Sequence, residues 1–232
     1  MKLYDAIIHE TFEAAGGAKR FPAASLAPWP ATESSELIMQ RQAAFELGGS
    51  GLPSANYTLV TTDPAYAGDE VLVLGPDLTD IKADTAFARI VVLETEEISE
   101  DDAGHDMIRQ MEFVRYHVFP KGYMVRVSST SFEEQVRVSR DAVKQGIRFA
   151  RVGRTYIERY KKVPGVKSVK ILFLTEKALV ERLKPNAKKA DDITKTLSHI
   201  LDGLPTDCGH CQLKAVCDEV EGMREMHLGK KK

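Results

Sequence analysis

Short apolar runs bounded by turn residues are the feature that most constrains the fold of this chain. Residues 71–74 form one such run, which Gly75, Pro76 and Asp77 stop, and residues 88–93 form another. Runs of this length are typical of strands that are covered on both faces of a sheet. A similar run at residues 169–174 predicts the last strand of the chain. The sequence therefore predicts a sheet with a buried centre.

Shorter strands accompany these runs. They are predicted at residues 45–49, 57–61, 123–129 and 135–139. The last two are separated by a polar turn, so we expect them to pair with each other.

The spacing of apolar side chains predicts several helices. They cover residues 3–15, 149–160, 176–183 and 191–201, with a short helix that Ser139 caps. An acidic patch at residues 94–102 is expected to begin another helix, because acidic side chains favour a helix N-terminus. Met107, Met111, Val114 and Val118 would continue it. Strands and helices mix without a strict βαβ rhythm, which favours an α+β fold with a mixed sheet flanked by helices.

Composition limits the class of protein. The chain has 232 residues, of which 43% are hydrophobic, and its net charge is -2. This length and apolar content support a substantial core, and the charge does not favour binding to polyanions as a whole. Because no apolar run has the length of a membrane span and the N-terminus lacks a signal sequence, we expect a cytoplasmic protein with no membrane partner.

Changes in composition divide the chain into three parts. Residues 1–35 hold the first helix and a Pro-rich connector that carries the only tryptophan, Trp29. Residues 36–183 form the predicted α+β domain. Residues 184–232 contain a polar linker at residues 184–189, a helix and a cysteine-containing segment.

All three cysteines lie in this last segment, as Cys208, Cys211 and Cys217. Two residues between Cys208 and Cys211 let both thiolates converge on one ion, and Gly209 relieves the turn. If residues 212 onward are helical, Cys217 lies less than two turns past Cys211 and can reach the same centre. The spacing therefore predicts a metal site, and the alternative is three buried or idle thiols with a fortuitous C-x-x-C and no metal.

Thiolate ligands suit either an iron-sulfur cluster, such as a 4Fe-4S cluster, or zinc. Because the chain has no fourth cysteine, another group must complete the site. The candidates are Asp207, His210, His227, a small molecule or a side chain of a partner. A second copy of the chain is one such partner, so a shared site in a homodimer is a further interpretation.

A second candidate site is basic. Between residues 137 and 170 the chain has eleven lysines and arginines but only two acidic residues, Asp141 and Glu158. Such a surface can hold the phosphates of a ligand such as coenzyme A, or an acidic partner protein, or it can simply be a solvated helix face. The residues that we single out for cofactor binding are Arg148, Arg151, Arg154 and Arg159.

Nucleic acid fits this surface less well than a phosphate-bearing cofactor. The aromatic residues among the cations are Phe149, Tyr156 and Tyr160, and their spacing is that of a buried helix stripe.

Several segments resemble the β subunit of the carbon monoxide dehydrogenase/acetyl-CoA synthase complex, over roughly residues 36–183. In order, they are residues 45–49, 73–80, 135–146, 152–154 and 166–175. The matched part is similar to the middle α+β domain of that family. The resemblance implies proximity to coenzyme A and to corrinoid or carbon monoxide dehydrogenase partner proteins.

The chain also departs from this family. The nickel centre of the family needs a Cys-Gly-Cys tripeptide and further cysteines, whereas this chain has Cys208-Gly209-His210-Cys211. The nickel-cluster domain is therefore lacking, and catalysis would require a partner that supplies nickel or a cluster. The resemblance implies an accessory iron-sulfur protein of anaerobic one-carbon or corrinoid metabolism. The alternative is a non-catalytic interaction subunit with a structural zinc site.

Overall fold

The structure is a computed structural model of the chain, and it describes residues 3–49, 51–66, 68–98, 102–127, 133–201, 211–220 and 223. Within these ranges the helices are α1 (Asp5–Ala14), α2 (Asp102–Tyr116), α3 (Arg140–Lys144), α4 (Phe149–Tyr160), α5 (Lys177–Leu201) and α6 (Lys214–Glu219). The strands are β1 (Lys19–Pro22), β2 (Ala31–Thr32), β3 (Ala43–Leu47), β4 (Ser54–Thr61), β5 (Glu70–Leu74), β6 (Phe87–Thr95), β7 (Phe119–Pro120), β8 (Tyr123–Val127), β9 (Glu134–Ser139) and β10 (Val166–Leu174).

A five-stranded mixed sheet forms the centre, in the order β1-β5-β10-β6-β4. β5 is parallel to β10 and β4 to β6, whereas β10 is antiparallel to β6 and β1 to β5. The three apolar runs that predict buried strands are β5, β10 and β6, which are neighbours inside the sheet. The prediction of an α+β fold with a mixed sheet flanked by helices is confirmed.

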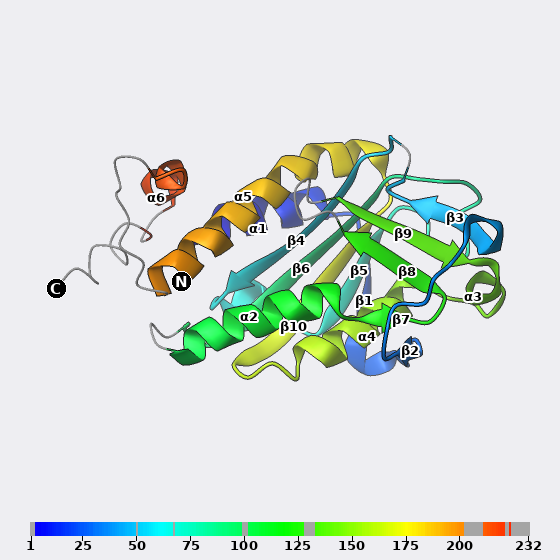
Figure 1. Cartoon of the computed structure of the whole chain (residues 1–232), viewed down its shortest axis with the longest axis horizontal. Helices are drawn as coiled ribbons and strands as arrows, with labels where there is room; N and C mark the ends of the chain where they lie inside the picture. The colour runs from blue at the N-terminus through cyan, green and yellow to red at the C-terminus, as the bar shows by residue number, and fades with distance from the viewer. Residues whose placement is uncertain are drawn as a thin grey trace.

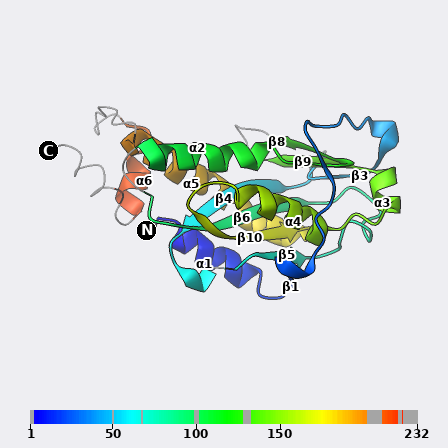
Figure 2. The ribbon, with the colours of Figure 1, turned by 90° about the horizontal axis from the view of Figure 1, so that it is seen from below.

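Helices cover both faces of this sheet. α1 and α5 lie on one face, where the hydroxyl oxygens of Thr11 in α1 and Tyr57 in β4 are 3.3 Å apart. α2 and α4 pack together on the other face, and Figure 2 shows α1 and α2 on opposite sides of the sheet. Gly153 lets α4 approach closely, because a Cβ atom there would lie 2.6 Å from Val71 Cγ2.

A second sheet has three strands in the order β3-β9-β8 and lies at one end of the large sheet (Figure 1). β8 and β9 are antiparallel, as the sequence predicts. α3 follows β9 directly, and the Ser139 hydroxyl accepts a hydrogen bond of 3.1 Å from the Ala142 amide. Ser139 is therefore the N-cap that the sequence predicts.

The predicted helix over the acidic patch begins later than expected. β6 continues through Thr95, since Glu94 lies opposite Ser168 of β10 and accepts a hydrogen bond of 2.7 Å from its hydroxyl. α2 starts only at Asp102 and ends at Tyr116, so Val118 is buried outside the helix. Pairing in the sheet has overridden the preference of acidic residues for a helix start.

The prediction of a linker at residues 184–189 is also wrong. These residues form the middle of α5, which joins the two predicted helices into one of 25 residues. Leu183 and Ala187 are buried there, and Asn186 donates a hydrogen bond of 3.0 Å to Glu10 of α1. Burial of this face compensates for Pro185, whose ring is exposed. Among the described helices, none is both long enough and apolar enough to cross a membrane.

Candidate functional site

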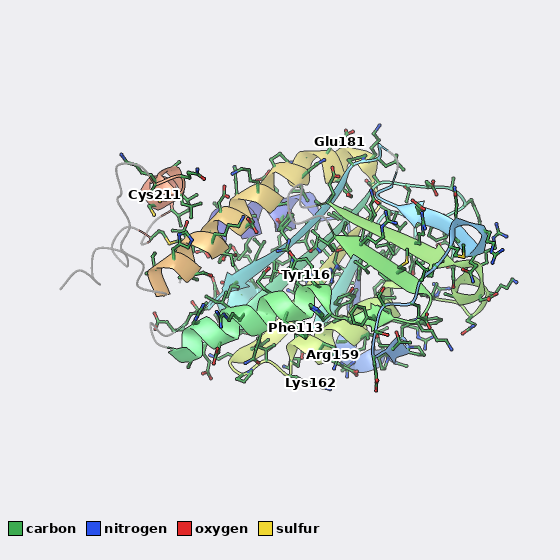
Figure 3. The ribbon with its side chains drawn as sticks, viewed as in Figure 1. Phe113, Tyr116, Arg159, Lys162, Glu181 and Cys211 are labelled. Atoms are coloured by element: carbon green, nitrogen blue, oxygen red, sulfur yellow. The ribbon has the colours of Figure 1, made fainter. Side chains whose placement is uncertain are left out.

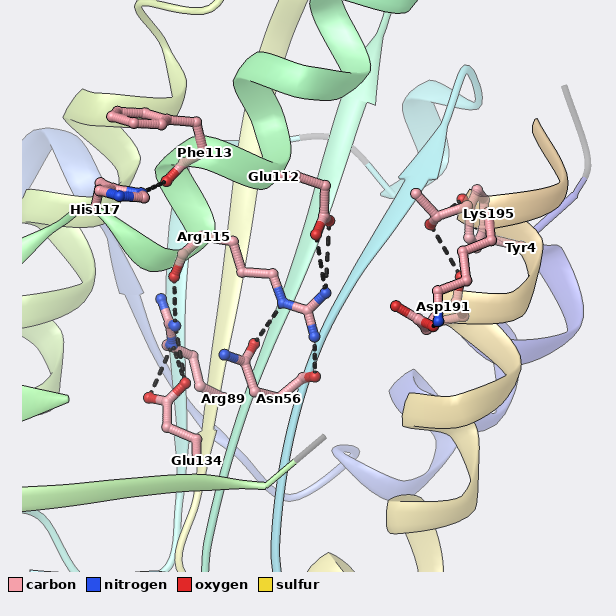
Figure 4. Close-up of polar contacts among 12 residues, drawn as sticks. Tyr4, Asn56, Arg89, Glu112, Phe113, Arg115, His117, Glu134, Asp191 and Lys195 are labelled. Atoms are coloured by element: carbon pink, nitrogen blue, oxygen red, sulfur yellow. Dashed lines mark hydrogen bonds and ion pairs between the residues drawn. The ribbon is translucent and has the colours of Figure 1, made fainter. Parts of the chain in front are cut away.

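The most heavily buried charges of the described chain are Arg89 in β6 and Glu134 at the start of β9, both fully inaccessible. Arg89 Nη2 lies 2.8 Å from Glu134 Oε2, and Nε lies 3.0 Å from the same oxygen (Figure 4). A charge at such depth is tolerated only with a well-placed partner. The pair fastens the small sheet to the large one.

Arg115 extends this polar network to α2. Its Nε donates to Asn56 Oδ1 over 3.2 Å, its Nη2 donates to the backbone carbonyl of Asn56, and its Nη1 lies 3.3 Å from Glu112. Arg89 Nη2 donates in turn to the carbonyl of Arg115 over 2.9 Å. The C-terminal end of α2 is therefore held against β4 and β6 by two arginines (Figure 4).

Buried tyrosines surround Arg89. Its guanidinium carbon lies 4.2 Å from the ring centroid of Tyr156, a cation–π contact. Burial raises the pKa of Tyr160 to about 12, and burial also raises the pKa of Tyr123 well above its ordinary value. Because these side chains are closed to solvent, the network positions the two sheets and does not present a reactive group to a substrate.

A groove of about 730 Å³ opens beside the small sheet. Its walls come from Trp29 of the Pro-rich connector, from residues 36–42, from the turn before β8, and from the junction of β9 with α3. The lining includes Trp29, Leu37, Lys121, Gly122, Arg140 and Lys144. A groove of this size, with apolar and cationic side chains together, has the dimensions of a site for a cofactor-sized ligand.

Trp29 is fixed firmly in the wall of this groove. Its indole Nε1 donates to the carbonyl of Lys121 over 2.8 Å, and its carbonyl accepts a bond of 2.7 Å from the Thr155 hydroxyl of α4. The guanidinium of Arg151 lies 4.7 Å from the Trp29 ring centroid. The connector is thus anchored on α4, and only 4% of Trp29 is exposed.

Gly122 forms part of the floor of this groove. Its φ is +70°, and a Cβ atom would lie 2.7 Å from Ala142 Cβ. Its amide donates to Glu36 Oε2 over 2.9 Å, so one acidic wall residue is already engaged. Lys144 is 77% exposed and lies 3.7 Å from Asp141. The exposure of this lysine leaves its amino group available to an anionic ligand.

The four arginines singled out in the sequence lie along α4, from its N-cap to its last turn, and none of them lines the groove. Arg148 lies 3.9 Å from Asp77, and Arg154 pairs with Glu158 at 3.0 Å. Arg151 supports Trp29 and so acts on the groove indirectly. Arg159 is exposed and has no ion pair within the described residues. The four side chains therefore do not meet at one site.

Two of the three predicted metal ligands can be placed, because Cys208 lies outside the described residues. Cys211 (Figure 3) and Cys217 are both partly buried, and Cys217 is in α6. Cys217 packs against the main core together with Val216 and Val220. Within the described ranges no three His, Cys, Asp or Glu side chains form a group suited to a metal, and His210 and His227 also fall outside those ranges. The metal site remains a prediction.

The sequence reasoning missed Arg89 and the groove. A signal for Arg89 exists, since it is the one charged residue inside the apolar run at residues 88–93. The groove has no such signal, because its walls come from segments that are distant in the chain, such as Trp29 and Lys121, which are 92 positions apart.

No protein-family model matches this chain, and no curated protein matches it either. The resemblance to the acetyl-CoA synthase subunit therefore remains a prediction from the sequence.

Proposed function

We propose that this chain is an accessory iron-sulfur protein of anaerobic one-carbon or corrinoid metabolism, with Cys208, Cys211 and Cys217 as cluster ligands. The observation that carries the proposal is the position of Cys211 and Cys217 on one short segment that packs on the main body. Thiolates at this spacing are suitable ligands for a cluster. When bound, a cluster with one iron lacking a cysteine ligand supplies electron transfer or a binding position for an outside group.

The groove supports the second part of the proposal, which is binding of a phosphate-bearing ligand such as coenzyme A. Lys121, Arg140 and Lys144 supply the cations, and Leu37, which is 79% exposed, supplies apolar surface. Arg148 and Arg159 are exposed on α4 and offer further charge to an acidic partner protein. Corrinoid or carbon monoxide dehydrogenase proteins are the partner class that the resemblance suggests.

The first experiment is iron, zinc and acid-labile sulfide analysis with a visible spectrum, on protein purified without oxygen. We expect iron and sulfide near one cluster per chain, and loss of the visible absorption in Cys211→Ser. Gln212→Ala is the matched control, because Gln212 is an exposed neighbour. Zinc without sulfide would contradict the cluster and support the alternative, a non-catalytic interaction subunit with a structural zinc site.

The groove is tested separately, by calorimetric titration with coenzyme A. Lys144→Glu should weaken binding about five- to tenfold at low salt, and by less at high salt, because exposed charges are screened. Lys189→Glu, an exposed lysine on α5, should leave binding unchanged. Equal affinity in wild type and Lys144→Glu at low salt would remove the groove from the proposal without affecting the cluster.

A further inference from the structure

The outer face of α2 carries aromatic side chains in solvent. Phe113 is 60% exposed and Tyr116 is 37% exposed, and they are two of the four large hydrophobic residues that are exposed in the described chain. The Phe113 ring stacks on His117 with centroids 3.8 Å apart, which keeps it in place. A fixed, exposed aromatic side chain is typical of a protein contact surface.

The same helix borders a hollow of about 350 Å³. Its wall includes Met107 and Gln110 of α2 and the turn at Pro164 and Gly165 that follows α4. Cavities of about 150 Å³ already admit a benzene ring, so this hollow has room for a phenyl side chain.

Phe113 and the hollow lie along one stripe of α2. Asp106, on the rim of the hollow, is seven residues before Phe113, so the two residues project from the same side of the helix. At 1.5 Å per residue they are about 10 Å apart along the helix axis. A projecting ring and a hollow that can receive one therefore stand next to each other on the same face.

The two ends of this face carry opposite charges. The hollow is bordered by the carboxylates of Glu96, Glu97 and Asp106, all exposed. On the side of Phe113 lie two exposed cations that have no acidic partner within the described residues, Arg159 and Lys162 beside the end of α4. Figure 3 shows Phe113, Tyr116, Arg159 and Lys162 gathered on one side of the molecule.

We propose that this face binds a second copy of the chain. In a two-fold symmetric dimer the two α2 helices cross antiparallel near Gln110, and the Phe113 ring of each copy enters the hollow of the other. The same rotation brings the cations of one copy to the carboxylates of the other. Such a contact is self-complementary, as a two-fold interface requires.

The charge pattern favours this occupant over nucleic acid. A polyanion needs an extended row of cations, whereas here the cations of α4 lie on the side of Phe113 and the carboxylates border the hollow. A partner with the same arrangement in reverse neutralises both ends, and a second copy has that arrangement.

The test is the molar mass of the full chain in solution, measured by sedimentation equilibrium over a range of concentrations. We expect a monomer–dimer equilibrium, and at least a tenfold higher dissociation constant for Phe113→Glu. Leu37→Glu is the matched control, because Leu37 is 79% exposed but lies in the connector groove. Circular dichroism should show both variants folded, since neither side chain belongs to the core.

A second measurement locates the symmetry axis. In Gln110→Cys, mild oxidation should join the introduced thiols of the two copies in a disulfide. Peptide mass spectrometry identifies this disulfide, and oxidised wild type is the control for disulfides that the native cysteines form. A monomer at all concentrations overturns the proposal. A dimer that Phe113→Glu leaves unchanged, or a Gln110→Cys variant that forms no such link, overturns it as well.

Discussion

At the scale of single residues, we expect the largest loss of stability when one partner of the buried pair Arg89 and Glu134 is removed. Arg89→Met should lower the free energy of unfolding by about 3–5 kcal/mol, because Glu134 is left as an uncompensated buried charge. The double variant Arg89→Met with Glu134→Leu should lose less than Arg89→Met alone. Urea unfolding curves measure all three proteins.

An exposed pair supplies the control for this prediction. Arg20 and Glu70 form two hydrogen bonds of 2.8 and 3.0 Å, but Arg20 is 61% exposed. Arg20→Met should cost at most about 1 kcal/mol. Equal losses of unfolding free energy for Arg20→Met and Arg89→Met would contradict the prediction that burial makes the Arg89–Glu134 pair more costly to break.

Tyr160 should make the protein sensitive to alkaline pH. Burial raises its pKa from 10.0 to about 12, so the unfolded chain loses this proton at lower pH than the folded protein. Its contribution to stability is therefore complete below pH 10.0 and is lost as the pH rises towards 12, by about 3 kcal/mol for two pKa units. Tyr160→Phe should show a correspondingly smaller loss in urea unfolding across this range. If the free energy of unfolding falls equally with pH in wild type and Tyr160→Phe, Tyr160 is not the group responsible.

At the scale of elements, Gly122 fixes the turn that forms the groove floor. Gly122→Ala should destabilise the protein by about 1–2 kcal/mol more than Gly146→Ala, and thermal unfolding measures the difference. Both glycines have positive φ, of +70° and +76°, but only Gly122 has neighbours within 4 Å of an added Cβ atom. Similar losses at both positions would mean that Ala142 and Ser139 move aside easily.

Pro185 lies in the middle of α5, where it cannot donate a backbone hydrogen bond. Pro185→Ala should raise the free energy of unfolding by about 1–3 kcal/mol, since alanine restores the donor and suits a helix. Lys189→Ala, at another exposed position of the same helix, should change it by less than about 0.5 kcal/mol. A destabilised Pro185→Ala variant would show that the helix depends on the bend at the proline.

At the scale of the whole molecule, the main body has a core that does not depend on the cysteine segment. One continuous apolar cluster runs from α1 to α5, and the described C-terminal residues that join it are Val216, Cys217, Val220 and Met223. Removal of the proposed metal with a chelator should therefore lower the melting temperature by less than about 4 °C, which corresponds to roughly 1 kcal/mol for a protein of this size. Hydrogen exchange in β6 and β10 should stay slow. Global unfolding on chelation would instead make the metal part of the core.

Elements with a strong local pattern were predictable from the sequence. The apolar runs identify β5, β6 and β10, and the 3.6-residue spacing predicts the helix at residues 149–160, which is α4. The two errors have a common physical cause. Glu94 pairs in the sheet. Within residues 184–189, Asn186 and Ala187 are buried and Asn186 bonds to Glu10 of α1, so tertiary contacts outweighed the polar local sequence at both places.

The sequence alone determined the strands with continuous apolar runs, the helix at residues 149–160, the α+β class and the clustering of cysteines, because each depends on residues close together in the chain. The tertiary structure alone decided the strand order, the pairing of Arg89 with Glu134 and the position of the groove. These depend on contacts between residues far apart in the chain, such as 45 positions for Arg89 and Glu134 and 92 positions for Trp29 and Lys121, and a local pattern carries no information on such contacts. The same holds for the α2 face. The sequence places Phe113 in a helix but does not show that its side chain is exposed beside a hollow.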